Sequence, residues 1–166
     1  MTTTLNPPKC FINGEESSSS RETTILFSSK EIRRIVHSLL SSSTYFFFYQ
    51  SRSNCRDLNP SDLTSFHFPS SLLTSSILEI LSEELQENLE HNSWFQTRTQ
   101  KQTGKVKIQS FTSSKSKPII DQIDTVLAQH YGFTEEELDF IINYDIKYRM
   151  GKALFGEAEN GEDEED

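Results

Sequence analysis

The first fifty residues contain one strand-like and one helix-like hydrophobic pattern. Residues 23–27, TTILF, are β-branched and aromatic and predict a short strand. Ser29 then offers an N-cap to a helix, which we expect to continue through residues 41–44 into the aromatic run 45–49. Residues 1–22 contain two prolines, a glycine and a serine run, and predict a loop. The apolar positions at helical spacing after Ser29 are Ile32, Ile35, Val36, Leu39 and Leu40.

Two further helices are predicted before the middle of the chain. Asn59, Pro60 and Asp62 match a helix start, with a capping amide, a proline in the first turn and an early acid. This helix is expected to be short, because residues 66–69 end in a proline. Residues 70–91 predict a long helix with glutamates mostly opposite an apolar stripe. The stripe consists of Leu72, Leu73, Ile77, Ile80, Leu81, Leu85 and Leu89.

Capping residues mark two closing helices. Ser116 and Pro118 indicate the start of the first helix, and Gly132 supplies a left-handed exit. The second helix begins at Thr134, whose hydroxyl can form a reciprocal capping box with the Glu137 carboxylate. The hydrophobic-staple positions around this box hold Phe133 and Leu138.

These elements predict an α+β fold: a helix-rich single domain with a few short strands or a β-hairpin and an acidic, disordered C-terminal tail. The chain divides into a loop at 1–22, helices plus hairpin at 23–111, a two-helix segment at 112–151 and the tail at 152–166. Its 166 residues have room for one domain. Hydrophobic residues make up only 34%, which indicates polar loops or a missing neighbour.

Cysteine usage and hydropathy bear on the cellular setting. Cys10 and Cys55 provide neither a disulfide framework nor metal-ligand spacing, so a reducing compartment is expected. No apolar run approaches the roughly 20 residues that a transmembrane helix needs, and the first residues lack a signal-peptide pattern. We therefore expect a soluble, cytoplasmic protein.

Charge is distributed unevenly along the chain. The formal net charge is −9, but seven acids lie in the last ten residues, so residues 1–156 carry only −2. Residues 94–99 and 105–111 alternate in polarity around the turn sequence KQTG, which predicts a β-hairpin. Residues 94–118 contain no acid, and their local charge of +6 is of the kind that phosphate backbones attract, although a solvated lysine-rich loop has the same composition. The basic residues are Arg98, Lys101, Lys105, Lys107, Lys115 and Lys117.

A second polar cluster directly follows the aromatic run. Its hydrogen-bonding side chains include Arg52, Asn54, Arg56 and Asn59. Arginine suits guanine edges and phosphates, and asparagine suits adenine. We interpret residues 45–49 as an apolar anchor that holds this cluster on a rigid base, with roughly 1.5–3 kcal/mol for each fully buried ring. The alternative is that Asn54, Asp57 and Asn59 only cap turns and helix starts.

Two of these segments resemble a known enzyme family. Residues 130–151, HYGFTEEELDFIINYDIKYRMG, closely resemble the carboxy-terminal end of bacterial adenine-specific (N6) DNA methyltransferases, which occur alone or fused to a nuclease in type IIG restriction-modification enzymes. Residues 53–66, SNCRDLNPSDLTSF, are similar to the target-recognition region of that family. The resemblance spans roughly residues 23–151. It implies double-stranded DNA as a partner, with Arg52, Asn54, Arg56 and Asn59 available for base or phosphate contacts. It also implies a separate methylase domain or subunit as a second partner, and S-adenosylmethionine as the cofactor of the complete family enzyme.

The motifs that carry the family's chemistry are absent from this sequence. Its six glycines include no pair at the Gly-x-Gly spacing that could cradle S-adenosylmethionine. The family's catalytic tetrapeptide is Asn or Asp, then two prolines, then an aromatic residue that stacks on the flipped base. Asn6-Pro7-Pro8 is followed by Lys9, and no strand or cofactor motif is predicted before it, so we interpret it as a proline loop. No catalytic, cofactor-binding or metal-binding residue is predicted.

Histidines and late aromatic residues are weaker candidates. The four histidines, His37, His67, His91 and His130, have no carboxylate or cysteine at ligand spacing, and we expect surface or boundary positions. Phe140, Tyr144 and Tyr148 recur every four residues on the final predicted helix, where core packing is a better explanation than base stacking.

The sequence therefore favours one functional hypothesis and leaves two alternatives open. The favoured hypothesis is the DNA-target recognition portion of an adenine-specific DNA methyltransferase, as a fragment or split subunit without the catalytic domain. The first alternative is a non-catalytic protein-interaction module that docks on a methylase or nuclease partner. The second is a truncated product that folds poorly alone, which the low hydrophobic content would explain.

Overall fold

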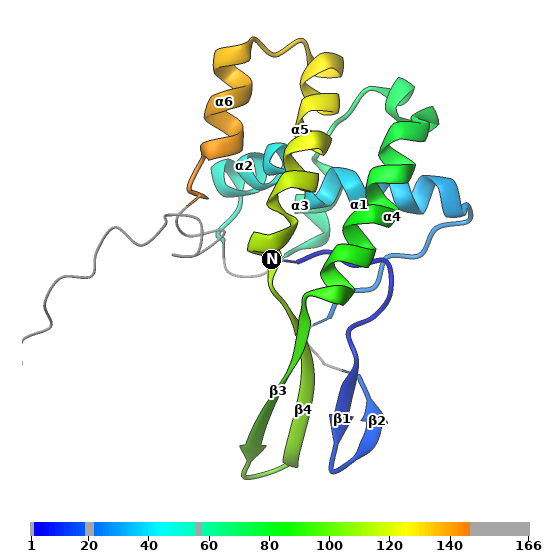
Figure 1. Ribbon diagram of the computed structural model, residues 1–166, viewed down its shortest axis with the longest axis vertical. Coiled ribbons are helices and arrows are strands. Elements are labelled where there is room, and N and C mark those ends of the chain that lie inside the picture. Colours follow the sequence, from blue (N-terminus) through cyan, green and yellow to red (C-terminus); the bar gives the residue numbers. More distant parts are fainter. Residues whose placement is uncertain (1, 19–21, 56–57, 147–166) are drawn as a thin grey trace, which may run out of the picture.

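The described residues form a layer of helices from which a sheet projects (Figure 1). The computed structural model describes residues 2–18, 22–55 and 58–146. Within these ranges it contains six α-helices and one four-stranded antiparallel sheet, which confirms the helix-rich α+β fold. The tail predicted at 152–166 lies outside the described residues.

The helices are α1 (Lys30–Ser41), α2 (Ser43–Arg52), α3 (Pro60–Thr64), α4 (Ser76–His91), α5 (Lys117–Tyr131) and α6 (Glu135–Asn143), with short 3-10 turns η1 (Ser70–Thr74) and η2 (Ser113–Ser116). The strands are β1 (Cys10–Ile12), β2 (Glu15–Ser17), β3 (Ser93–Gln100) and β4 (Gly104–Phe111).

The sheet has the strand order β2-β1-β4-β3. β3 and β4 pair over their full length, from Ser93 opposite Phe111 to Gln100 opposite Gly104, which confirms the predicted hairpin. The prediction of a loop over residues 1–22 is wrong for the part that forms β1 and β2. The Asn13-Gly14 turn between these strands has positive φ at both residues, as two-residue hairpin turns require, and this dipeptide favours such turns.

Residues 23–27 are not a strand, contrary to their composition. They run outside any helix or strand in the segment before α1, and Leu26 is 89% exposed. A strand is stable only when its backbone groups pair with a neighbour, and no strand among the described residues pairs with this segment. The β-branched and aromatic residues are therefore not sufficient to make a strand here.

The helix that follows Ser29 ends earlier than predicted. Ser29 caps α1 as expected, since its hydroxyl accepts a hydrogen bond from the Ile32 N–H at 3.3 Å. Ser42 has an extended backbone and separates α1 from α2. Its hydroxyl oxygen lies 3.0 Å from the Tyr45 N–H and 2.7 Å from the Leu39 carbonyl oxygen. A serine hydroxyl competes with the helical backbone in this way, so Ser42 ends one helix and caps the next.

Asp124 of α5 holds the start of α2 from across the fold. Its fully buried carboxylate accepts hydrogen bonds from the N–H groups of Ser43 and Thr44, each at 2.9 Å, and from the Thr44 hydroxyl at 2.9 Å. Burial raises the pKa of Asp124, and the hydrogen bonds from Ser43 and Thr44 act in the opposite direction. A carboxylate at a helix N-terminus also complements the helix dipole. This contact fixes α2 against α5.

The predicted helix over residues 70–91 is divided in two. Residues 70–74 form η1, and Ser75 caps α4 by accepting a hydrogen bond from the Leu78 N–H at 3.4 Å. Two members of the predicted stripe, Ile77 and Ile80, are more than half exposed, which corrects that prediction. The buried residues of α4 follow helical spacing, and two of them, Ser82 and Gln86, are polar. The others are Leu78, Leu81, Leu85 and Leu89.

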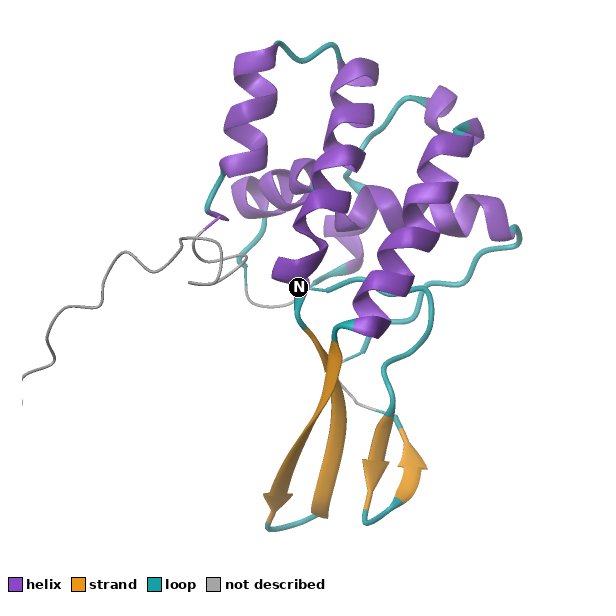
Figure 2. Cartoon of the chain, in the orientation of Figure 1, coloured by secondary structure: helices purple, strands orange, loops and turns teal. Residues whose placement is uncertain are grey.

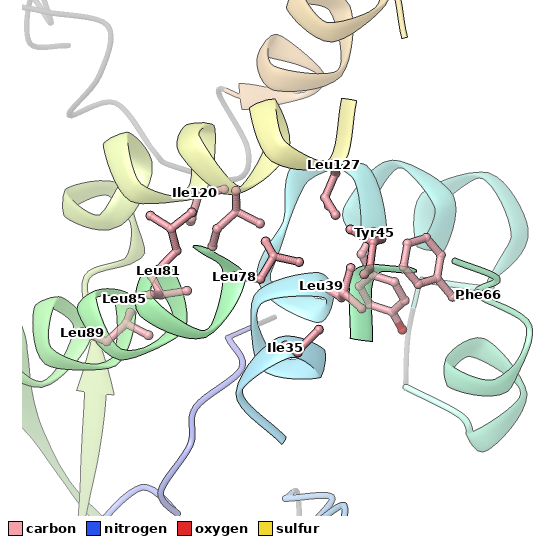
Figure 3. Packing of buried hydrophobic residues seen from close by; sticks show 12 residues of the cluster. Ile35, Leu39, Tyr45, Phe66, Leu78, Leu81, Leu85, Leu89, Ile120 and Leu127 are labelled. Atoms are coloured by element: carbon pink, nitrogen blue, oxygen red, sulfur yellow. The ribbon is translucent and has the colours of Figure 1, made fainter. Parts of the chain in front are cut away.

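The hydrophobic core lies between α1, α4 and α5, with Tyr45 of α2 and Phe66 at one end (Figure 3). Tyr45 is completely buried and its ring meets Phe66 edge to face at 5.0 Å between centroids. The capping signals of the later helices are confirmed in position. The Thr134 N–H donates to Glu137 Oε2 at 2.8 Å, and the Glu137 N–H donates to the Thr134 hydroxyl at 3.2 Å. Gly132 ends α5 with a φ of 73°.

Candidate nucleic-acid interface

The sheet projects away from the helical layer, so much of its surface is accessible (Figure 2). Directly paired residues in an antiparallel sheet lie on the same face. Lys107 pairs with Thr97 on β3 and with Phe11 on β1, and Lys105 pairs with Thr99. Because side chains alternate along each strand, Phe95 shares this face as well. We name it the lysine–aromatic face, and it consists of Phe11, Phe95, Thr97, Thr99, Lys105 and Lys107.

The two phenylalanines give this face a partly apolar floor. The rings of Phe11 and Phe95 lie 6.2 Å apart between centroids, and Phe95 is 40% exposed. The Lys107 ammonium lies 4.4 Å from the Phe95 ring centroid, within the range of a cation–π contact. The one acid at a paired position on this face is Glu16, opposite Phe11 on the edge strand β2. Most of the face therefore offers positive charge and flat rings together.

The two faces of the sheet differ in character. The face opposite the lysine–aromatic face contains Cys10 and Val106, which are buried, and Trp94, which is half exposed. Arg98 pairs with Val106 and therefore lies on this second face. Lys101 lies in the turn between β3 and β4. Of the four predicted basic residues in the hairpin, the structure thus brings together Lys105 and Lys107.

Asn13 ties the turn of the β1–β2 hairpin to the turn of the β3–β4 hairpin. Its N–H donates to the Lys105 carbonyl oxygen at 2.8 Å, and its side-chain oxygen accepts from the Lys105 N–H at 2.9 Å. Its amide nitrogen donates to the Thr103 carbonyl oxygen at 3.2 Å. Gly104 has a φ of 79°, and a Cβ at this position would clash with the Asn13 side chain. These contacts hold the turn that presents Lys105.

The second predicted cluster lies on the helical layer, apart from the hairpin (Figure 1). Arg52 is exposed on the last turn of α2, with its guanidinium carbon 5.6 Å from the Phe48 ring centroid. Asn54 is also exposed and follows the end of this helix. Arg56 and Asp57 lie outside the described residues. Asn59 caps α3, where its N–H donates to Asp62 Oδ2 at 2.8 Å, as the capping alternative predicts.

The aromatic run before Arg52 is only partly an anchor. Tyr45 and Tyr49 are buried, whereas the three phenylalanines between them are half-buried. Two of these rings line an open cavity of about 750 Å³ between α2, α6 and residues 65–67. Phe140 is 55% exposed beside it, so its predicted core packing is wrong, whereas the Tyr144 ring packs against Phe47 with centroids 4.9 Å apart. Tyr148 lies outside the described residues. The aromatic residues around the cavity are Phe47, Phe48, Phe66, Tyr131, Phe133 and Phe140.

The prediction of a surface or boundary position is wrong for His37. This side chain is buried between Ser82, whose Oγ lies 2.8 Å from Nδ1, and the Thr3 carbonyl oxygen, 3.2 Å from Nε2. The pKa of His37 is lowered to about 4, mainly by burial and also by the positive charge of Arg33, while the hydrogen bond to Thr3 acts in the opposite direction. The other three histidines are exposed. Among residues 2–18, 22–55 and 58–146, no group of three or more His, Cys, Asp or Glu side chains could hold a metal ion.

Phe11 was not predicted as a site residue, because residues 1–22 were expected to form a loop. The Asn13-Gly14 dipeptide between CFI and EES was the signal that could have identified the hairpin. The Asn6-Pro7-Pro8 segment lies outside helices and strands, as expected for a proline loop. The Asn6 side chain donates a hydrogen bond to Glu90 Oε1 at 3.3 Å. That contact places Asn6 against α4.

No helix in the described part of the chain is long and apolar enough to cross a membrane. Comparisons with protein-family models, with curated proteins and with solved structures find no match for this chain.

Proposed function

We propose that this protein binds double-stranded DNA and that the lysine–aromatic face contacts the phosphate backbone. The observation that carries the proposal is the alignment of Lys105 and Lys107 on one exposed face of a projecting sheet. These lysines lie in a stretch, residues 94–118, that contains six basic residues and no acid. Phosphate contacts of this kind supply most of the sequence-independent affinity of DNA-binding proteins.

The shape of the sheet supports the same proposal. Strands of a β-sheet can enter a groove of duplex DNA, and this four-stranded sheet extends from the helical layer with β3 at one edge (Figure 2). Arg98 and Thr97 lie on opposite faces of β3, so a sheet that approaches DNA by this edge would present both to the groove. Arg98 is the residue on this strand that could donate two hydrogen bonds to guanine.

The more specific form of the proposal is the recognition portion of an adenine-specific DNA methyltransferase. It rests on the sequence resemblance of residues 53–66 and 130–151 and assigns base contacts to Arg52, Asn54 and Arg56. The S-adenosylmethionine site and the catalytic residues would then belong to a separate domain or subunit. The test is to find a methylase subunit that assembles with this protein and to compare the DNA sequences that the complex methylates with and without a substitution of Arg52.

DNA binding itself is tested with a matched set of lysine variants. We expect Lys105→Ala with Lys107→Ala to weaken binding to any mixed-sequence duplex by roughly tenfold to thirtyfold, since each lost contact is worth about 1 kcal/mol. Lys30→Ala removes an exposed lysine from the start of α1, in the helical layer, and serves as the control. Fluorescence anisotropy at fixed salt measures all three proteins. Equal binding by the parent and the double variant would contradict the proposed interface.

A protein-docking function is the second candidate, and the aromatic cavity between α2 and α6 favours it. Its volume of about 750 Å³ and its aromatic walls are typical of sites that accept apolar side chains. Replacement of the partly exposed Phe140 by serine should abolish docking and leave DNA affinity unchanged. If the parent protein does not bind duplex DNA at low salt, the docking function is the better of the two.

A further inference from the structure

A second cavity lies between the N-terminal segment and α1, away from the lysine–aromatic face. It has a volume of about 310 Å³ and is lined by residues of the segments 2–8 and 22–27 and of α1 (Figure 1). Its walls combine threonine side chains with apolar ones, among them Ile25, Phe27 and Val36. Ile25 and Phe27 are each more than one-third exposed in a segment without regular structure. The described residues therefore leave apolar surface exposed at this place.

Arg33 of α1 lines this cavity and has no acceptor for its guanidinium. Among the described residues it forms neither an ion pair nor a side-chain hydrogen bond, and its Nε is buried without a partner. The two terminal NH₂ groups are the remaining donors that this side chain can offer to a ligand in the cavity that it lines. Buried or half-buried guanidinium groups are normally paired, because an unpaired one loses hydration without compensation.

The charged neighbours of Arg33 do not pair with it. Arg34, the next residue, forms an ion pair with Glu83 of α4. Glu22 lines the same cavity as Arg33 but forms no ion pair with it. The positive charge of Arg33 instead acts on the neutral His37 imidazole, whose pKa it lowers. The cavity thus contains a positive charge that no side chain in the described part of the protein pairs with, beside exposed apolar side chains.

We propose that this cavity binds a small amphiphilic anion. Its carboxylate or phosphate head group accepts hydrogen bonds from the Arg33 guanidinium, whose planar fork suits either group. Its apolar chain contacts Ile25, Phe27 and Val36 and covers the surface they expose. The volume of about 310 Å³ lies at the small end of the range for ligand pockets, so the ligand is short.

Isothermal titration calorimetry of the full chain with four eight-carbon probes tests this proposal. The probes are sodium octanoate, octyl phosphate, 1-octanol and octylammonium, each below its micelle concentration. We expect one or both anions to bind, and the tighter of the two identifies the head group. The uncharged alcohol should bind roughly tenfold more weakly than that anion, because it lacks the charge-assisted hydrogen bonds to Arg33. Octylammonium, which Glu22 would favour, should not bind.

Two variants of adjacent arginines locate the site. Arg33→Gln should reduce binding of the anion by roughly tenfold or more, and Arg33→Lys should retain part of it. Arg34→Gln removes the same charge from the neighbouring position and should bind as the parent does. Circular dichroism melts of each variant establish that it is folded. Binding of the alcohol or the ammonium probe as tightly as the anions, equal binding by Arg33→Gln, or no binding of either anion would each overturn the proposal.

Discussion

The buried imidazole of His37 predicts a specific loss of stability in mild acid. Nε2 faces the Thr3 carbonyl oxygen, which can only accept, so this nitrogen carries the proton of the neutral ring. Nδ1 then accepts a hydrogen bond from the Ser82 hydroxyl at 2.8 Å. Protonation would place a second N–H against that hydroxyl and a positive charge in the core, close to Arg33. The folded protein therefore resists taking up the proton.

The sign and size of the effect follow from the two pKa values of His37. The unfolded chain has the ordinary value of 6.5, and the folded protein has a value of about 4. Below pH 6.5 the unfolded state binds a proton that the folded state does not, so the free energy of unfolding decreases as the pH falls toward 4. The contribution lost is about 2 kcal/mol by pH 5 and about 3 kcal/mol by pH 4. For a protein of this size that is a large fraction of the total stability.

Urea denaturation of three proteins at a series of pH values measures this contribution. His37→Gln keeps a donor and an acceptor but cannot be protonated, and His67→Gln replaces an exposed histidine as the control. All three proteins share the titration of their carboxyl groups, so the difference between them isolates the histidine. We expect the parent and His67→Gln to lose about 2 kcal/mol more than His37→Gln between pH 7.5 and pH 5. Parallel curves for parent and His37→Gln would refute the reasoning.

Three further sets of substitutions test the contacts that hold the fold and the interface. Asp124→Ala leaves the buried N–H groups of Ser43 and Thr44 without an acceptor and should destabilise the protein by about 3 kcal/mol in chemical denaturation; an unchanged midpoint would show that α2 is not held this way. Thr134→Ala with Glu137→Ala removes both halves of the capping box and should cost about 1–2 kcal/mol, so coincident thermal melts would contradict the assignment of this helix start. Gly104→Ala should cost roughly 1–2 kcal/mol because of its positive φ and the clash with Asn13, and the added change Asn13→Ala should recover less than the whole loss. Complete recovery would mean that the backbone conformation of Gly104 carries no cost.

Local signals predicted the elements that depend on nearby residues. Ser29, Asn59 and Thr134 cap helices because their partners lie within three residues, and the β3–β4 hairpin follows from alternation around one turn. Predictions failed where a distant partner decides the outcome. The expected α1–α2 continuation is broken at Ser42, while Asp124, some 80 residues away, caps the start of α2. Residues 23–27 have the composition of a strand but no neighbouring strand to pair with.

The candidate interface was also predictable only where it depends on residues close together in the sequence. Lys105 and Lys107 could be assigned to one face from the period of a strand alone. The cross-strand pairing of Lys107 with Phe11 could not be predicted in this way, because it depends on the pairing of β1 with β4, which lie almost one hundred residues apart in the sequence. The cavity beside Arg33 has walls from the N-terminal segment, residues 22–27 and α1, and no sequence motif marks such a combination.

The salt dependence of duplex binding tests the proposed interface most directly. Each phosphate contact releases condensed counterions, so the logarithm of the binding constant falls with the logarithm of salt concentration by about 0.9 for every contact. If Lys105 and Lys107 each contact a phosphate, the slope for Lys105→Ala with Lys107→Ala should be shallower than that of the parent by about 1.8 on every duplex sequence. A double variant with the slope of the parent would show that these lysines touch no phosphate, and the lysine–aromatic face would not be the DNA-binding surface.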